Sequence, residues 1–127
     1  MAEMKRLVFG NGLMSPSLDG SKRYTIRKYR EGSHDVSKDE IVVGEFKDGL
    51  NILIQITDDT VKCSFAELKK KSKKKNSGFQ FDDAYFNDLK NYYPELIWSD
   101  TGAVIFFEVL KVNGVPTVCF NEHAKAE

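Results

Sequence analysis

The chain has 127 residues and is poor in cysteine, in proline and in long apolar runs. Its two cysteines, Cys63 and Cys119, stand far apart and outside any CxxC pair, so the sequence predicts neither a disulfide framework nor a zinc site. No apolar run approaches the roughly 18 residues of a membrane span. The first residues lack the apolar stretch of a signal peptide. We therefore expect a cytoplasmic protein without membrane contact, and a single domain over residues 1–127.

The motifs of common cofactor-dependent and hydrolytic enzymes are also missing. The sequence contains no phosphate-binding loop, no Gly-x-Ser-x-Gly elbow and no dinucleotide fingerprint. His34 and His123 stand alone in polar segments, and Asp58-Asp59 is more typical of a turn than of a metal site. We expect no cofactor and no metal.

The net charge is zero, with 19 basic and 19 acidic residues, but the charges are unevenly placed. Residues 76–127 are acidic in balance, whereas the segment before them is a dense lysine run. Such a run either contacts phosphates through a salt-dependent attraction or forms a solvated segment that keeps the protein soluble. The composition leaves both interpretations open. The lysine run consists of Lys69, Lys70, Lys71, Lys73, Lys74 and Lys75.

Most of the predicted elements are strands. Alternating apolar residues give the clearest strand signal in segment 50–57. Lys47-Asp48-Gly49 before it and Asn113-Gly114 near the C-terminus are hairpin-turn signals. Strands are predicted at 6–9, 23–29, 41–46, 50–57, 61–64, 103–112 and 115–120, with a helical turn or two at 13–19.

Two helices are predicted between the strands. Ser64 begins a Ser-x-x-Glu capping pattern for a helix that enters the lysine run, and Asp82 or Asp83 begins a second helix. This order argues against a doubly wound sheet and favours an α+β fold, a small mixed β-barrel of five to six strands with two to three short helices. Its core is expected at about residues 6–112, with an extra C-terminal hairpin strand and tail at 113–127.

The most basic strand of the chain lies within residues 22–30. Five of these nine residues are lysine or arginine. Tyr24 and Tyr29 alternate with them and are candidates to stack on bases, whereas the aromatic residues of segment 79–93 are expected in the core. The segment is either a binding cleft or a solvated strand edge. The candidate ligand-binding residues are Lys22, Arg23, Tyr24, Thr25, Arg27 and Lys28.

The amine of Lys22 and the hydroxyl of Thr25 are also the two groups, a base and a nucleophile, that a nucleophilic site requires. In an ideal strand these two side chains point to opposite faces. They meet only if Lys22 lies in the turn that leads into the strand. Gly20 makes such a turn feasible, because glycine adopts backbone conformations that other residues avoid.

The same residues resemble a known family. Leu18-x-Gly20-x-Lys22-x-x-Thr25-Ile-Arg27 is similar to the signature of the ASCH domain, a PUA-like β-barrel. The usual Pro-Gly-Asp entry to the next strand is replaced here by Lys38-Asp39-Glu40. Leu89-x-x-Tyr92-Tyr93-Pro94 and the apolar strand after it also look like the last helix and strand of the family. The resemblance covers about residues 7–110.

The resemblance implies a PUA-like barrel that binds RNA or a modified nucleoside in a cleft beside the basic strand. It also implies a second activity, because one branch of the family hydrolyses the acetyl amide of acetylated cytidine with the motif lysine and threonine and a downstream glutamate. Lys22 and Thr25 match the first two, but the place of the glutamate falls near Gly78. The nearest carboxylates in the sequence are Glu67, Asp82 and Asp83.

We therefore expect an RNA- or nucleoside-binding protein with a cleft on the basic strand and an electrostatic rim supplied by the lysine run. The first alternative is a small amidohydrolase acting on an acylated cytidine, with Thr25 as nucleophile and Lys22 as base. The second is a protein-interaction module whose acidic C-terminal half meets a basic partner.

Overall fold

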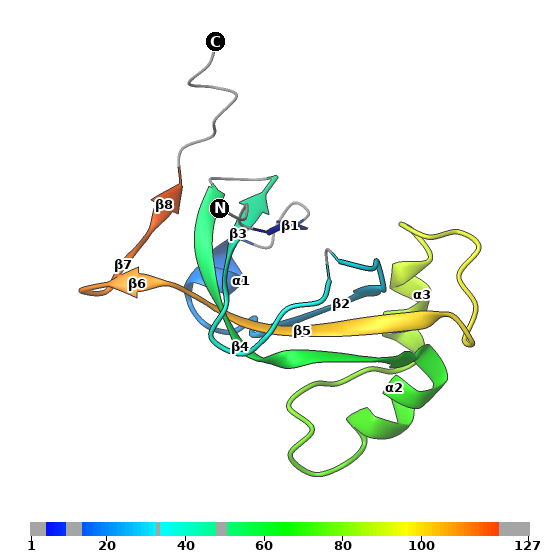
Figure 1. Cartoon of the computed structure of the whole chain (residues 1–127). Helices are drawn as coiled ribbons and strands as arrows, with labels where there is room; N and C mark the ends of the chain where they lie inside the picture. The colour runs from blue at the N-terminus through cyan, green and yellow to red at the C-terminus, as the bar shows by residue number, and fades with distance from the viewer. Residues whose placement is uncertain (1–4, 10–13, 33, 48–50, 120–127) are drawn as a thin grey trace.

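A curled, mixed β-sheet forms the body of the protein (Figure 1). The computed structural model describes residues 5–9, 14–32, 34–47 and 51–119. The main path of the sheet runs in the order β1 (Arg6–Phe9), β3 (Ile41–Phe46), β4 (Asn51–Ser64), β5 (Thr101–Val109) and β2 (Tyr24–Lys28). β1 runs parallel to β3, and the remaining neighbours are antiparallel, with β8 (Val118–Cys119) joined to one end of β4. The result is a half-barrel whose two edge strands, β1 and β2, leave an open seam.

Three short helices accompany the sheet in the described part of the chain: α1 (Met14–Leu18), α2 (Phe65–Ser72) and α3 (Asp83–Leu89). Both predicted capping residues are confirmed. Ser64 Oγ accepts the Glu67 N–H at 3.2 Å, and Asp82 Oδ1 accepts the Tyr85 N–H at 2.9 Å. Figure 1 shows α2 and α3 together at one end of the long β4–β5 pair. No helix in the described ranges is long and apolar enough to span a membrane.

The sheet separates two hydrophobic clusters. On the concave side Phe9 stacks on Phe46, with ring centroids 4.6 Å apart, and packs with Phe107 of β5. The other side is aromatic and is built around Phe65 and Phe86 of the helices. Residues directly opposite in an antiparallel pair share a face. Thr25 and Arg27 of β2 oppose Ile105 and Ala103, whereas Tyr24 and Ile26 oppose Phe106 and Val104 of the aromatic cluster.

Asp58-Asp59 does not form the predicted turn. The chain continues through it in a single strand, β4, and the register against β5 shifts between Ile56 and Asp58 and again between Asp58 and Val61. This irregularity is a bulge, which bends a strand and increases its twist. Asp59 Oδ1 accepts the Lys38 N–H at 2.8 Å, so its carboxylate holds the neighbouring loop instead of closing a hairpin.

The predicted strand at 103–112 ends earlier than expected, at Val109. It is followed by a small hairpin of β6 (Lys111–Val112) and β7 (Val115–Pro116), which projects from the body in Figure 1. Its predicted turn is confirmed, since Asn113 and Gly114 have φ values of +53° and +79°. The other predicted turn, at residues 47–49, lies largely outside the described residues.

Candidate functional site

The open seam of the half-barrel contains a cavity of about 400 Å³, which we call the seam cleft. One wall comes from β1, another from β2 and the turn before it, and a third from α3 and the segment that follows it. Because β2 is an edge strand, side chains from both of its faces reach the cleft. The lining residues are Val8, Phe9, Lys22, Thr25, Ile26, Arg27, Tyr85, Asp88, Leu89, Tyr92 and Tyr93.

Lys22 and Thr25 lie in the same cavity because Lys22 precedes the strand. β2 begins at Tyr24, and the turn before it is closed by the Lys22 N–H, which donates to the Pro16 carbonyl at 3.0 Å. Gly20 has a φ of +85°, a conformation that favours glycine. The strict alternation of a strand therefore does not apply to Lys22, and the amine and the hydroxyl line one cleft.

The ammonium group of Lys22 is half-buried and has no hydrogen bond or ion pair within the described residues. The nearest aromatic ring, that of Tyr24, has its centroid 6.0 Å from Nζ. Burial lowers the pKa of Lys22, and the positive charge of Arg27 lowers it further. A desolvated cation without a counter-ion is costly to the fold, and this places Lys22 among the residues that are candidates for ligand contact.

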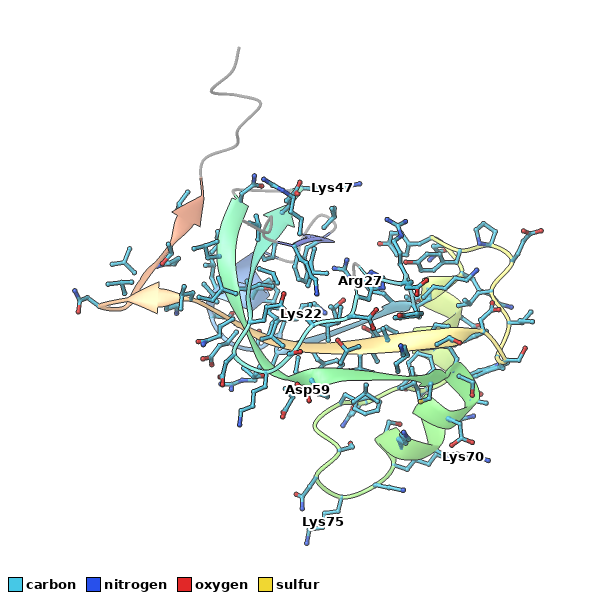
Figure 2. The ribbon with its side chains drawn as sticks, in the orientation of Figure 1. Lys22, Arg27, Lys47, Asp59, Lys70 and Lys75 are labelled. Carbon is cyan, nitrogen blue, oxygen red and sulfur yellow. The ribbon has the colours of Figure 1, made fainter. Side chains whose placement is uncertain are left out.

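Arg27 is a second cation, fixed in place by its neighbours. Its Nε donates to Thr25 Oγ1 at 3.3 Å, and its guanidinium lies 4.9 Å from the centroid of the Phe9 ring. Burial lowers the pKa of Arg27, with Tyr93 and Tyr85 acting in the opposite direction, but an arginine stays charged. Thr25 is only 6% exposed, so its hydroxyl lies at the floor of the cleft. In Figure 2 Lys22 and Arg27 lie on one side of the β4–β5 pair.

Tyrosines supply the aromatic part of the cleft. Tyr85 accepts the Ile26 N–H of the edge strand through its hydroxyl at 3.3 Å, and burial raises its pKa, so the phenol stays neutral. Tyr92 follows the end of α3 and is 74% exposed while lining the cleft. The sequence analysis expected Tyr92 in the core. That expectation is wrong, because the backbone N–H groups of Tyr92 and Tyr93 both bond to the Leu89 carbonyl, and this tight turn carries Tyr92 out of the helix packing.

The carboxylate in the cleft is Asp88, which the sequence analysis did not single out. It lies three residues after Tyr85 on α3, and this spacing places the two on one face of the helix. The three carboxylates named from the sequence have other places, and none of them lines the seam cleft. Glu67 lies 3.9 Å from Lys70, Asp82 caps α3, and Asp83 lies 2.7 Å from Lys69.

Three of the six ligand-binding residues predicted on the basic strand lie outside the seam cleft: Arg23, Tyr24 and Lys28. Arg23 donates from Nε to the Gly20 carbonyl at 3.0 Å and lines a different cavity. Tyr24 packs edge-on against Phe79 at a centroid distance of 6.3 Å, and its hydroxyl accepts the Gln80 N–H at 3.1 Å. Tyr24 faces the aromatic cluster because it lies on that side of β2, so its ring packs in that cluster and does not line the seam cleft.

A second cavity of about 400 Å³ adjoins the seam cleft, and we call it the basic pocket. It contains Lys28, which the sequence analysis assigned to the binding site, and His34, which that analysis set aside. His34 is buried. Burial lowers its pKa to about 4, and the charges of Arg27 and Arg30 act in the same direction. The pocket is lined by Arg6, Val8, Arg27, Lys28, Tyr29, Arg30, His34 and Tyr93.

The lysine run does not form a rim for either cavity. Lys69 and Lys70 belong to α2, where Lys69 pairs with Asp83 at 2.7 Å. Lys69, Lys70 and Lys73 line a separate groove beside Trp98. Figure 2 shows Lys70 and Lys75 across the β4–β5 pair from Lys22 and Arg27. The expected rim is therefore corrected, because α2, which carries the first three lysines of the run, packs on the aromatic cluster through Phe65 and Leu68.

Among the described residues, no group of three or more histidine, cysteine or acidic side chains is placed to hold a metal ion. Cys63 carries a free thiol, and burial raises its pKa. The groups that line the seam cleft are two cations, a hydroxyl, a carboxylate and tyrosines.

Comparisons with models of protein families, with curated proteins and with solved structures found no match for the chain.

Proposed function

We propose that the seam cleft binds a nucleoside, either free or as a unit of RNA. The observation that carries the proposal is the cavity of about 400 Å³ in which the unpaired Lys22, the fixed Arg27 and the exposed Tyr92 come together. An aromatic side chain with a free face stacks on a base, and cations nearby donate hydrogen bonds to carbonyl oxygens of the base or to the sugar.

The polar groups of the cleft favour some bases over others. Lys22 and Arg27 are donors only, whereas the Asp88 carboxylate is an acceptor. A base that carries both a carbonyl oxygen and an exocyclic amino group meets both kinds of partner, and cytosine and guanine have both groups. Uracil offers only its imino N–H as a donor, and adenine has no carbonyl oxygen. The cleft thus supports a preference for cytosine or guanine, with the base on Tyr92.

We also propose that the chain is a distant ASCH-like, PUA-like domain. Two features support the assignment. The motif residues Lys22, Thr25 and Arg27 line a single cleft, and the sheet is a curled, mixed half-barrel with an open seam beside the motif strand. This is the arrangement that the family resemblance implies for ligand binding.

The proposal is tested by titrating the four ribonucleosides into the purified protein and measuring heat or NMR shifts. Cytidine or guanosine is expected to bind best. Tyr92→Ala is expected to weaken binding by about tenfold, since stacking contributes roughly 1–3 kcal/mol per base, and Tyr92→Phe is expected to retain it. The matched control is Ile97→Ala, which removes a side chain that is 56% exposed and outside the cleft. Absence of nucleoside binding, or equal losses in Tyr92→Ala and Ile97→Ala, would contradict the proposal.

Asp88 favours a second candidate, an amidohydrolase acting on an acylated cytidine. In that reaction the Thr25 oxygen bonds to the acyl carbon while a neutral Lys22 amine takes the hydroxyl proton. The carbon–nitrogen bond then breaks, the departing amine takes the proton from Lys22, and water cleaves the acyl ester to release the acid. Asp88 would orient the substrate amine. The burial that lowers the pKa of Lys22 makes the neutral amine more accessible.

Binding remains the first candidate because the catalytic contact is not formed. No hydrogen bond joins Lys22 Nζ to Thr25 Oγ1 in the described structure, and the Thr25 hydroxyl accepts from Arg27 instead. Incubation with acetylated cytidine, read by release of acetate, separates the candidates. Turnover that disappears in Thr25→Val and falls in Asp88→Asn would establish the enzyme. Tight binding of the same compound without acetate release would leave the seam cleft as a binding site.

A further inference from the structure

The seam cleft and the basic pocket share one wall. Val8, Arg27 and Tyr93 line both cavities, so a ligand in the first is in reach of the second. The two cavities differ in chemistry. The seam cleft has an aromatic and apolar surface with a carboxylate, whereas no acidic side chain is among the residues that line the basic pocket.

Four cations converge on the basic pocket from the two edge strands of the sheet. Arg6 comes from β1 and is paired with Glu45 at 3.1 Å. Arg27, Lys28 and Arg30 come from β2 and its C-terminal extension. The side chains of Lys28 and Arg30 have no ion pair or hydrogen bond to any described residue, so their charges remain available to an anion.

The segment that carries Arg30 is an exposed turn held by local hydrogen bonds. His34 Nδ1 accepts the Arg30 N–H at 3.0 Å, and Asp35 Oδ2 accepts from the Tyr29 hydroxyl at 2.6 Å and from the Gly32 N–H at 2.9 Å. With a pKa of about 4, His34 is neutral at physiological pH and can act as an acceptor for this backbone. These hydrogen bonds therefore fix the backbone that carries Arg30 beside the pocket.

We infer that the basic pocket is a phosphate site, and that the ligand of the seam cleft is a nucleotide rather than a free nucleoside. The inference rests on the proposed function, because the phosphate site is identified by its position next to the base site. The shared wall at Arg27 and Tyr93 corresponds to the sugar, which links the base to its phosphate. The phosphate belongs either to a mononucleotide or to the backbone of an RNA strand, since the recognising chemistry is the same.

The experiment compares cytidine and guanosine with their 5′- and 3′-monophosphates and with a short single-stranded RNA. The monophosphate is expected to bind about tenfold more tightly than the nucleoside, and added salt should reduce this advantage. Lys28→Gln combined with Arg30→Gln should remove the advantage and leave nucleoside affinity unchanged. The matched control is Lys74→Gln combined with Lys75→Gln, which removes the same charge from the lysine run and should keep the advantage.

The outcomes separate the inference from the function on which it rests. Equal affinity for nucleoside and monophosphates overturns the phosphate site and leaves the base site standing. An equal loss in the double variant and in its control also overturns it, since the effect is then one of net charge. If no nucleoside, nucleotide or RNA binds, both proposals fail. A gain for the RNA strand well beyond the monophosphate identifies the backbone as the source of the phosphate, whereas equal affinities identify the mononucleotide.

Discussion

The protein has two basic regions that differ in where the fold places their charges. The cations of the seam cleft and the basic pocket lie on the two edge strands or directly beside them. Lys22 and Arg27 are partly buried, whereas Arg6, Lys28 and Arg30 are exposed. Lys22, Lys28 and Arg30 have no counter-ion among the described residues. The lysine run lies on α2 and the segment after it, is mostly exposed, and pairs in part with acidic neighbours, as in Lys69 with Asp83. The denser cluster in the sequence is therefore not the one that lines the seam cleft and the basic pocket.

The difference shows that charge density along a chain is a poor guide to a binding site. The six lysines on α2 and the segment after it keep their water and their counter-ions, so they gain little from any one ligand. A cation that the fold has already stripped of water, such as Lys22, regains favourable contacts only when a ligand arrives. A charged side chain that is buried without a counter-ion is therefore a better indicator of a binding site than the number of charges in a segment.

The largest effect on stability is expected from a substitution where β5 packs against α2, the helix that carries the first lysines of the run. A Cβ atom at Gly102 would lie 2.7 Å from Leu68 Cδ1 and from Phe65 Cε1, both on α2. Gly102→Ala is therefore expected to lower the free energy of unfolding by about 2–3 kcal/mol, measured by urea denaturation. The folded fraction should bind nucleosides normally. Leu68→Ala added to it should cost less than the sum of the single changes, and strict additivity would show that α2 does not press on Gly102.

Lys22→Met tests the other side of the comparison. It is expected to weaken nucleoside binding by about 30-fold, because a charged hydrogen bond contributes roughly 1.5–3 kcal/mol, and to stabilise the fold by about 0.5–1 kcal/mol. Since the pKa of Lys22 is lowered in the folded state, the native protein should recover stability relative to the variant as the pH rises through that pKa. Lys73→Met in the lysine run is the control, expected to change neither quantity. Parallel losses of binding and stability in Lys22→Met would mean that Lys22 is structural.

A pH dependence is expected from His34, which supports the basic pocket. Its pKa is lowered to about 4 from an ordinary value of 6.5, so the unfolded chain binds more protons between these limits. The free energy of unfolding should therefore fall by about 2 kcal/mol as the pH decreases from 6.5 to 4. His34→Gln should flatten this slope. The pKa of Asp35 is lowered by the hydrogen bond from Tyr29, so its own contribution is lost below the ordinary value of 3.8. An unchanged slope in His34→Gln would exclude a buried neutral imidazole.

The smallest effect is expected from the lysine run itself. Lys74→Gln combined with Lys75→Gln should weaken binding of a short RNA strand by less than about threefold, with a slight reduction in the salt dependence of the affinity. Nucleoside binding should not change. The measurement is fluorescence anisotropy at several salt concentrations. A loss of tenfold or more would show that the lysine run is part of the RNA surface, and the distinction between the two basic regions would then be wrong.

Much of the fold follows from local sequence patterns. The strand at 6–9, the two helix caps at Ser64 and Asp82, and the turn at Asn113-Gly114 depend on neighbouring residues alone, and each is found where it was predicted. The convergence of Lys22 and Thr25 was also accessible, because Gly20 signals the turn that precedes the strand.

The rest of the site depends on which faces meet, and local patterns do not contain that information. The positions of Tyr24 and Tyr92 differ from those expected, because Tyr24 lies on the face of β2 that joins the aromatic cluster while Tyr92 lies past the end of α3 and lines the seam cleft. Asp88 was missed because an acidic residue on a helix is ordinary until its helix is known to border a cleft. His34 was missed because a lone histidine in a polar segment gives no sign that the fold will bury it.

The bulge in β4 has a consequence for how the site could change. Two walls of the seam cleft belong to opposite margins of one sheet, so their separation depends on the curvature of the strands between them. A bulge bends its strand, and β4 has such an irregularity where its register shifts against β5, between Ile56 and Val61. Adding or deleting one residue there would alter the aperture of the cleft without touching any residue that lines it. The size of the accepted ligand can thus be retuned from a position that never contacts it.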